Sequence, residues 1–214
     1  MKSRIFVALM LICLLVLTGC AKAAQSEVAL DQIVNENGMY AFPGYEWGME
    51  KADLQQALGY PLDKSYNTEF LVDDGSAPVD ENNAVMMADE ENRWHTIEGT
   101  PFYAAYQFSE GKLVSIQFGH DNFDRDNRKK VIDFVNYPNL AEKLVASITA
   151  QIGEPDVKYD VDGQVERPQY MPDSTVVHYV WNNEESDSVN WISVAYSVLN
   201  DISEITITAT KAPA

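Results

Sequence analysis

The sequence predicts an α+β protein made of two tandem repeats, in which each repeat is a helix-loop-helix packed on an antiparallel β-sheet. In both halves of the chain, a short amphipathic segment ends at a glycine and is followed by runs of alternating polar and apolar residues. The residues at positions 54, 58, 59 and 61 have counterparts at 148, 152, 153 and 155, a constant shift of 94. Matched spacing of this kind is typical of an internal repeat.

Four segments divide the chain. We expect a signal peptide over residues 1–19, a tether over 20–39, the first repeat over 40–120 and the second repeat over 121–214. The tether ends in a marginally helical pattern at 28–34. With 214 residues, the chain is long enough to bury a substantial core, either in one domain or in two small ones.

The first twenty residues predict export and lipidation. Lys2 and Arg4 precede an uninterrupted apolar run over 5–17, which is the order of regions in an export signal and is too short to span a bilayer comfortably. The run ends in a Leu-Thr-Gly-Cys motif at 17–20, which resembles the lipobox of bacterial lipoproteins. This resemblance implies cleavage before Cys20 and a diacylglyceryl group on its sulfur. The alternatives are an ordinary signal peptide and an uncleaved anchor.

Cysteine usage agrees with lipidation. Cys13 lies in the segment to be removed, so the mature chain keeps Cys20 alone and forms no internal disulfide. Two acyl chains are sufficient to hold a protein stably on a membrane. We therefore expect an extracytoplasmic protein at the cell membrane or cell envelope, which is held there by its N-terminal lipid and does not cross the bilayer.

The charge of the chain excludes one class of partner. The formal net charge is −18, and it becomes −20 when residues 1–19 with their two basic groups are removed (−18 minus +2). Nucleic acids and anionic headgroups attract basic surfaces. We therefore expect no nucleic-acid partner and no binding of anionic lipid through the folded body.

A helix is predicted over 48–58. Gly59 is placed to end it with a positive φ, and Pro61 prevents its continuation. The apolar positions recur at helical spacing, which predicts one buried face. That face consists of Met49, Leu54, Ala57 and Leu58.

Aromatic residues crowd the approach to this helix. They either pack the start of the helix against the sheet or form a sugar-binding platform, and we favour packing. These residues are Tyr40, Phe42, Tyr45 and Trp47.

An acidic loop is predicted after the first strand. Residues 66–72 have the composition of a strand, and 76–92 are rich in acidic and amide residues around one apolar island at 85–87. Long loops are often functional, but no EF-hand spacing is present, so solvation is favoured over calcium binding. The carboxylates considered for calcium are Asp80, Glu81, Asp89, Glu90 and Glu91.

The clearest local signal is a hairpin. Residues 102–109 and 113–118 both alternate with period two, and Glu110 and Gly111 form the loop between them. A helix is then predicted over 124–135, ended by Tyr137-Pro138. The second repeat follows with a helix over 139–152 and strands over 175–181, 189–199 and 202–210.

The helix of the second repeat is capped by Asn139 and Glu142 and ends at Gly153. Its predicted buried face consists of Leu140, Leu144, Val145, Ile148 and Ile152.

The opening helix carries a family resemblance. Its Gly48-Met49 start, apolar Leu54 and Leu58-Gly59-x-Pro61 end are similar to the opening helix of the SmpA/OmlA (BamE) lipoproteins of outer-membrane assembly. The tandem plan also resembles the β-lactamase inhibitor protein architecture. The resemblance implies this fold and transfers no functional residue.

Candidate chemistry in the sequence is sparse. His95, His120 and His178 lie far apart with no metal-ligand spacing, and no nucleophile motif is present. We therefore expect a protein that is not an enzyme, with no cofactor or metal, that binds a protein partner through its sheet face or the acidic loop. The alternative is a small-molecule or glycan binder that uses aromatic residues of the second sheet, namely Trp181, Trp191, Tyr179 and Tyr196.

Overall fold

The computed structural model describes residues 26–67, 79–88, 95–124, 129–130, 135–160, 175–183, 189–199 and 202–212. The predicted signal peptide and Cys20 lie outside these residues. In the described part of the chain, no helix is both long and apolar enough to cross a membrane.

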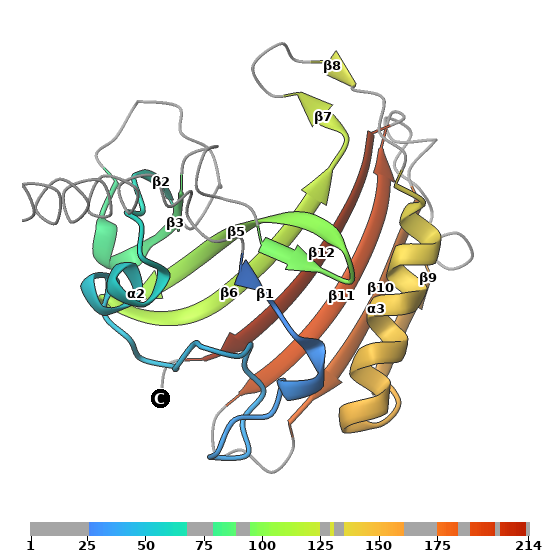
Figure 1. Cartoon of the computed structure of the whole chain (residues 1–214), viewed down its shortest axis with the longest axis horizontal. Helices are drawn as coiled ribbons and strands as arrows, with labels where there is room; N and C mark the ends of the chain where they lie inside the picture. Colours follow the sequence, from blue (N-terminus) through green and yellow to red (C-terminus); the bar gives the residue numbers. More distant parts are fainter. Residues whose placement is uncertain are drawn as a thin grey trace, which may run out of the picture.

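One large sheet dominates the molecule (Figure 1). Eight of its strands are antiparallel neighbours. In spatial order they are β2 (Lys64–Asn67), β3 (Ala84–Met87), β5 (Thr100–Ser109), β6 (Lys112–Asp121), β12 (Ile202–Lys211), β11 (Asn190–Leu199), β10 (Thr175–Asn182) and β9 (Val157–Asp160).

Two more strands extend the sheet beside the start of β5. β4 (His95–Ile97) pairs antiparallel with residues 100–102 of β5, whereas β3 pairs with residues 105–107 of the same strand. β1 (Ser26–Glu27) then pairs with β4 in the parallel direction. The free edge of β5 is therefore shared between two separate strand pairs.

The chain builds the sheet inward from both edges. The strands β2, β3, β5 and β6 run from one edge to the centre, and β9, β10, β11 and β12 run from the other edge. β6 and β12 meet in the middle with seven registered pairs, from Glu204–Asp121 to Thr210–Ser115. The ranges 40–120 and 121–214 therefore share one continuous sheet.

The predicted fold class is wrong. The structure is mostly one large sheet, and its described residues contain only two α-helices, α2 (Lys51–Leu58) and α3 (Tyr137–Ile152). Each predicted repeat needed a pair of helices, and the described residues of neither repeat contain one. The segment 28–34 forms only the short 3₁₀ helix η1 (Leu30–Gln32).

Two further segments differ from the prediction because strand pairing overrides local pattern. The predicted helix over 124–135 contains β8 (Lys129–Lys130), which pairs with β7 (Phe123–Asp124) in a two-stranded ribbon. The predicted loop over 76–92 contains a 3₁₀ helix, η2 (Glu81–Asn83), and β3, whose Met86 lies opposite Tyr106. Partners distant in sequence decide both cases, and local composition does not report them.

The hairpin prediction is confirmed. β5 and β6 are joined by Glu110 and Gly111, which both have positive φ angles, 50° and 75°. Two positive φ angles are the signature of a type I′ turn, whose twist matches that of the flanking strands. The strands predicted in the last third of the chain are present as β10, β11 and β12.

Both helix ends are confirmed, but neither helix begins where the sequence predicts: α2 begins at Lys51 instead of 48, after Glu50 in an extended conformation. α2 ends at Gly59 in the left-handed conformation, and α3 ends at Gly153. α3 begins earlier than predicted, because the side chain of Asn136 accepts a hydrogen bond from the Asn139 backbone N–H and Pro138 occupies the first turn. Proline is tolerated in a first turn, where its missing N–H has no intrahelical partner anyway.

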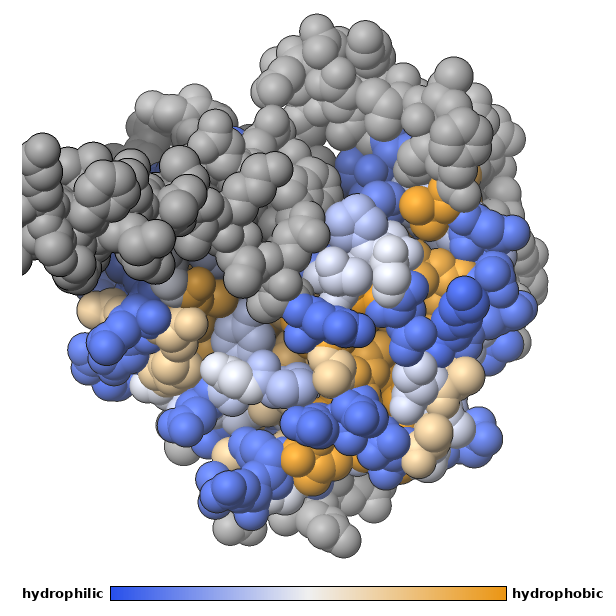
Figure 2. Space-filling view, in the orientation of Figure 1, coloured by the Kyte–Doolittle hydropathy of each residue, from blue (hydrophilic) through white to orange (hydrophobic). Residues whose placement is uncertain are grey.

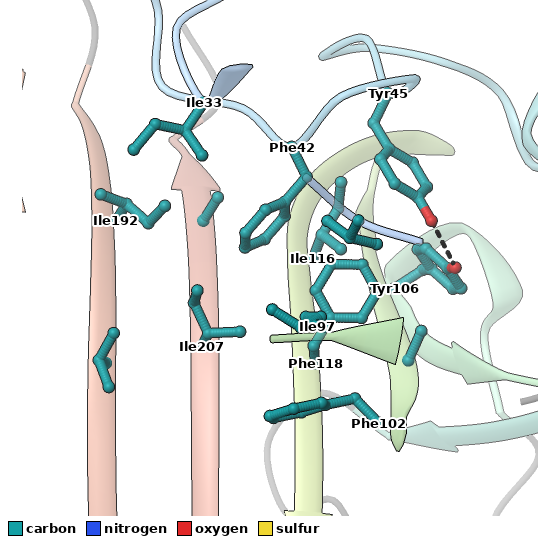
Figure 3. Close-up of a cluster of buried hydrophobic side chains, with 14 of the residues drawn as sticks. Ile33, Phe42, Tyr45, Ile97, Phe102, Tyr106, Ile116, Phe118, Ile192 and Ile207 are labelled. Atoms are coloured by element: carbon teal, nitrogen blue, oxygen red, sulfur yellow. Dashed lines mark hydrogen bonds between the residues drawn. The ribbon is translucent and has the colours of Figure 1, made fainter. Parts of the chain in front are cut away.

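A single core cluster lies between the sheet and the elements that cover it (Figure 3). Phe118 of β6 is fully buried at its centre, with the ring of Phe42 at 4.8 Å. α2 contributes Leu54 to this cluster, whereas the predicted partner Ala57 is exposed. α3 contributes a larger set, consisting of Tyr137, Leu140, Ala141, Leu144 and Ile148.

The segment before α2 belongs to the fold. Val28, Leu30 and Ile33 are buried, so this part of the expected tether packs in the core. A buried amide fixes the segment to the sheet: Asn190 accepts from the Tyr40 backbone N–H at 2.6 Å and donates to the Tyr40 carbonyl at 3.0 Å. The aromatic residues of this segment pack on the core, as the favoured interpretation predicted.

Candidate binding face

The side chains of the central strands divide between two faces of the sheet. One face belongs to the core cluster, on the side of α2, α3 and η1. The other face is partly exposed, and we call it the open face. It consists of Tyr103, Ala105 and Gln107 of β5; Ser115, Gln117, Gly119 and Asp121 of β6; Glu204, Thr206, Thr208 and Thr210 of β12; Trp191, Ser193, Ala195 and Ser197 of β11; and Val176, His178, Val180 and Asn182 of β10.

Small uncharged side chains form the middle of the open face. Register places Gln117 and Thr208 directly opposite each other, and Ser193 follows on the next strand. At one end, the Ser115 hydroxyl lies 2.9 Å from that of Thr210 and donates to the Ala209 carbonyl. Ser115 and Ser193 are buried, whereas Gln117 and Thr208 are partly exposed. The groups that the centre of the face presents are therefore the Gln117 amide and the Thr208 hydroxyl.

Charged side chains lie at one end of the open face and not at its centre. Glu204 and Asp121 are opposite each other at that end, and Glu204 accepts a hydrogen bond from the Tyr103 hydroxyl at 3.1 Å. Figure 2 shows the covered side, whose described surface is largely hydrophilic, with hydrophobic residues visible among the hydrophilic ones.

Tyr103 lies across Gly119, which has no side chain to obstruct it. A β-carbon at position 119 would lie 2.3 Å from the Tyr103 ring. Gly119→Ala should therefore displace this ring, break its bond to Glu204 and cost about 1–2 kcal/mol of unfolding free energy. Urea unfolding measures the loss. In a Tyr103→Ala background the same substitution should cost almost nothing, and an undiminished cost there would contradict the assignment.

The four aromatic residues predicted as a ligand site do not converge. Trp181 is 1% exposed, and its indole N–H donates to the Gly153 carbonyl at 2.9 Å. Tyr179 and Tyr196 lie on the core side and pack against the core cluster. Of the four, Trp191 alone belongs to the open face.

His95 belongs to a buried polar network that sequence patterns did not reveal. Its Nε2 lies 2.9 Å from the Tyr60 hydroxyl and 3.4 Å from the Tyr106 hydroxyl, which in turn lies 3.1 Å from that of Tyr45. Burial lowers the pKa of His95 to about 4 and raises the pKa of Tyr106. The neutral ring therefore acts as a core residue that joins β4 and β5 to the two loops around α2.

The other two histidines are also held in the sheet. His120 is buried on the core side, with its Nδ1 2.7 Å from the Pro101 carbonyl oxygen. His178 lies on the open face, and partial burial lowers its pKa. The three histidines do not form a common site.

The carboxylates considered for calcium have local roles where they are described. Asp80 caps η2 by accepting from Asn82 and Asn83, each at 3.0 Å, and Glu81 pairs with Lys51 at 2.7 Å. Asp89, Glu90 and Glu91 lie outside the described residues. Within the described ranges, no three His, Cys, Asp or Glu side chains converge as metal ligands would.

An open pocket lies beside the edge strand β2. It has a volume of about 510 Å³ and a mainly polar lining. The described residues that line it are Asp63, Lys64, Ser65, Tyr66 and Val79.

The sequence predicted two of the strands that carry the open face, but not how those strands pair with the rest of the sheet. Alternation in 189–199 and 202–210 predicted strands, and the Ser and Thr residues at alternate positions of these strands are the signal that points to a polar face. The register that places Thr208 beside Gln117 joins residues 91 positions apart (208 minus 117), which no local pattern shows.

Comparison with known proteins identifies no relative. No family model, no curated protein and no solved structure matches this chain. The resemblance of the opening helix to the SmpA/OmlA (BamE) lipoproteins therefore stays a prediction, and the site must be argued from its own geometry.

Proposed function

We propose that the protein is a lipid-anchored, extracytoplasmic binding module that is not an enzyme and binds a protein partner through the open face. The observation that carries the proposal is the absence of charged side chains from the centre of this face, at Gln117, Thr208 and Ser193, in a chain of net charge −18. Depletion of charged residues is the compositional mark of the centre of a protein–protein interface. The partly exposed side chains of Gln117 and Thr208 would offer hydrogen bonds to such a partner.

The arrangement of titratable groups supports binding over catalysis. His95 lies in the core and His178 on the open face, so the sheet separates them. General acid–base catalysis needs such groups within hydrogen-bonding reach of one substrate. The hydroxyls of Ser115 and Thr210 are hydrogen-bonded to each other within the sheet.

Cys20→Ser should release the protein from the membrane. The serine hydroxyl cannot form the thioether that carries the two acyl chains, so the variant should move from the membrane fraction to the soluble fraction. Intact mass measurement of the wild-type protein should show the added lipid. A wild-type protein of unmodified mass would contradict the lipid anchor. It would not affect the proposal that the open face binds a partner.

Site-specific cross-linking tests the binding face. A photo-cross-linking residue at Gln117 in the centre of the open face should give a defined adduct in cells. The matched control is the same residue at Ala146, which is exposed on α3. Equal adducts from both positions, or adducts from Ala146 alone, would contradict the proposed face.

A further inference from the structure

The chain between Cys20 and the folded body is short. β1 begins at Ser26, and the backbone N–H of Val28 already donates to the Thr96 carbonyl at 2.9 Å. A fully extended chain spans about 3.3–3.6 Å per residue, so six residues reach at most roughly 20 Å. A lipid on Cys20 therefore keeps the body close to the bilayer.

The connection from Cys20 to β1 joins the folded body on the covered side. β1 pairs with β4, whose His95 and Ile97 are buried, and the His95 ring lies 5.1 Å from the ring of Phe118. Phe118 belongs to the face that α3 covers. Figure 1 shows β1 in front of the sheet, on the same side as α3. The open face is on the opposite side.

We propose that the covered side of the body faces the bilayer, so that the open face points into the aqueous phase. The partner would then be a protein, or a domain of one, that reaches the open face from the water and is not embedded in the same bilayer. This inference rests on the proposed anchor and binding face.

The opposite orientation would require the whole connection to be fully extended. To lay the open face on the bilayer, the connection would pass around the edge made by β4 and β5. Two strand spacings of about 4.8 Å and one layer of about 10 Å add up to roughly 20 Å, which is the whole reach of six residues.

The charged residues near β1 indicate that the body does not itself adhere to the bilayer. Glu27, Asp31 and Glu98 are exposed on or beside β1, η1 and β4. Carboxylates are not attracted to lipid headgroups, and anionic lipids repel them. The short connection, and not adhesion of the body, would therefore set the orientation.

Energy transfer to the membrane surface tests the orientation. The lipidated protein is reconstituted in phosphatidylcholine vesicles that contain an acceptor lipid, with a donor dye on Asp31→Cys or on Thr208→Cys. Asp31 is exposed on the covered side, and Thr208 lies in the open face. The dye at position 31 should approach the acceptors more closely, by about 10 Å, the thickness of one layer. Equal approach, or closer approach at position 208, would overturn the proposal.

A lengthened connection is the matched control. Inserting twenty Gly and Ser residues after Gln25 should shrink the difference between the two dyes, because a flexible chain of this length imposes no orientation. An unchanged difference would overturn the proposal, since another contact would then set the orientation. Flotation of the vesicles is measured first: protein that does not float refutes the anchor itself, whereas protein that floats with equal transfer refutes the orientation alone.

Discussion

Replacing Phe118 with alanine should lower the free energy of unfolding by about 3–5 kcal/mol, the range for removing a fully buried aromatic ring. Phe118 is completely buried where the sheet and the N-terminal segment meet. Its ring lies 4.8 Å from that of Phe42 and 6.3 Å from that of Tyr45. Small proteins are stable by about 5–15 kcal/mol, so this one change removes a large part of the total.

Urea unfolding of the mature chain with Cys20→Ser measures this loss without the lipid. The control is Val189→Ala, because Val189 is 64% exposed and its truncation should change stability by less than about 0.5 kcal/mol. A Phe118→Ala protein within 1 kcal/mol of the parent, on the scale of a surface change, would show that this ring does not lie at the centre of the core.

Acid should destabilise the fold through His95 before most carboxylates titrate. Burial lowers the pKa of His95 from 6.5 to about 4, so between these pH values the unfolded chain binds a proton that the folded chain does not. Stability from this group is therefore complete above about pH 6.5 and falls as the pH drops toward 4. The slope reaches about 1.4 kcal/mol per pH unit, for a total of about 3 kcal/mol.

Unfolding free energies at several pH values between 7.5 and 4 test this dependence. The rings that face His95 are Tyr60, Tyr106 and Phe118, and none of them titrates in this range. His95→Phe should flatten the curve, whereas His178→Gln should preserve most of it. Parallel curves for the parent and His95→Phe would contradict the assignment. If His95→Phe fails to fold, an NMR titration of the His95 ring should still give a pKa near 4, and a value above 6 would contradict it.

Local pattern was sufficient for the elements whose determinants are local. Two positive φ angles at Glu110 and Gly111 made the hairpin, and Gly59 and Gly153 ended the helices, because these conformations depend on residues only a few positions apart. The alternation of 189–199 and 202–210 likewise predicted β11 and β12.

Pairing between distant segments decided the rest. The apolar residues at 85–87 form a strand because they pair with β5. Nothing in the sequence of 76–92 itself indicates that this partner is available. His95 looked like an isolated histidine, and its burial depends on Tyr60, Tyr106 and Phe118 from three other segments. The predicted tandem repeats failed for the same reason, because helical spacing in 124–135 does not exclude a strand pair.

The most direct test of the account is the effect of one charge in the centre of the open face. Thr208→Arg should abolish recovery of the partner that cross-links through position 117, because binding would bury a guanidinium that has no partner at the centre of the interface. Ala146→Arg, on the exposed surface of α3, should leave that recovery unchanged, with both variants matching the parent in urea midpoint. Full recovery with a correctly folded Thr208→Arg protein would contradict the claim that the open face is the binding site.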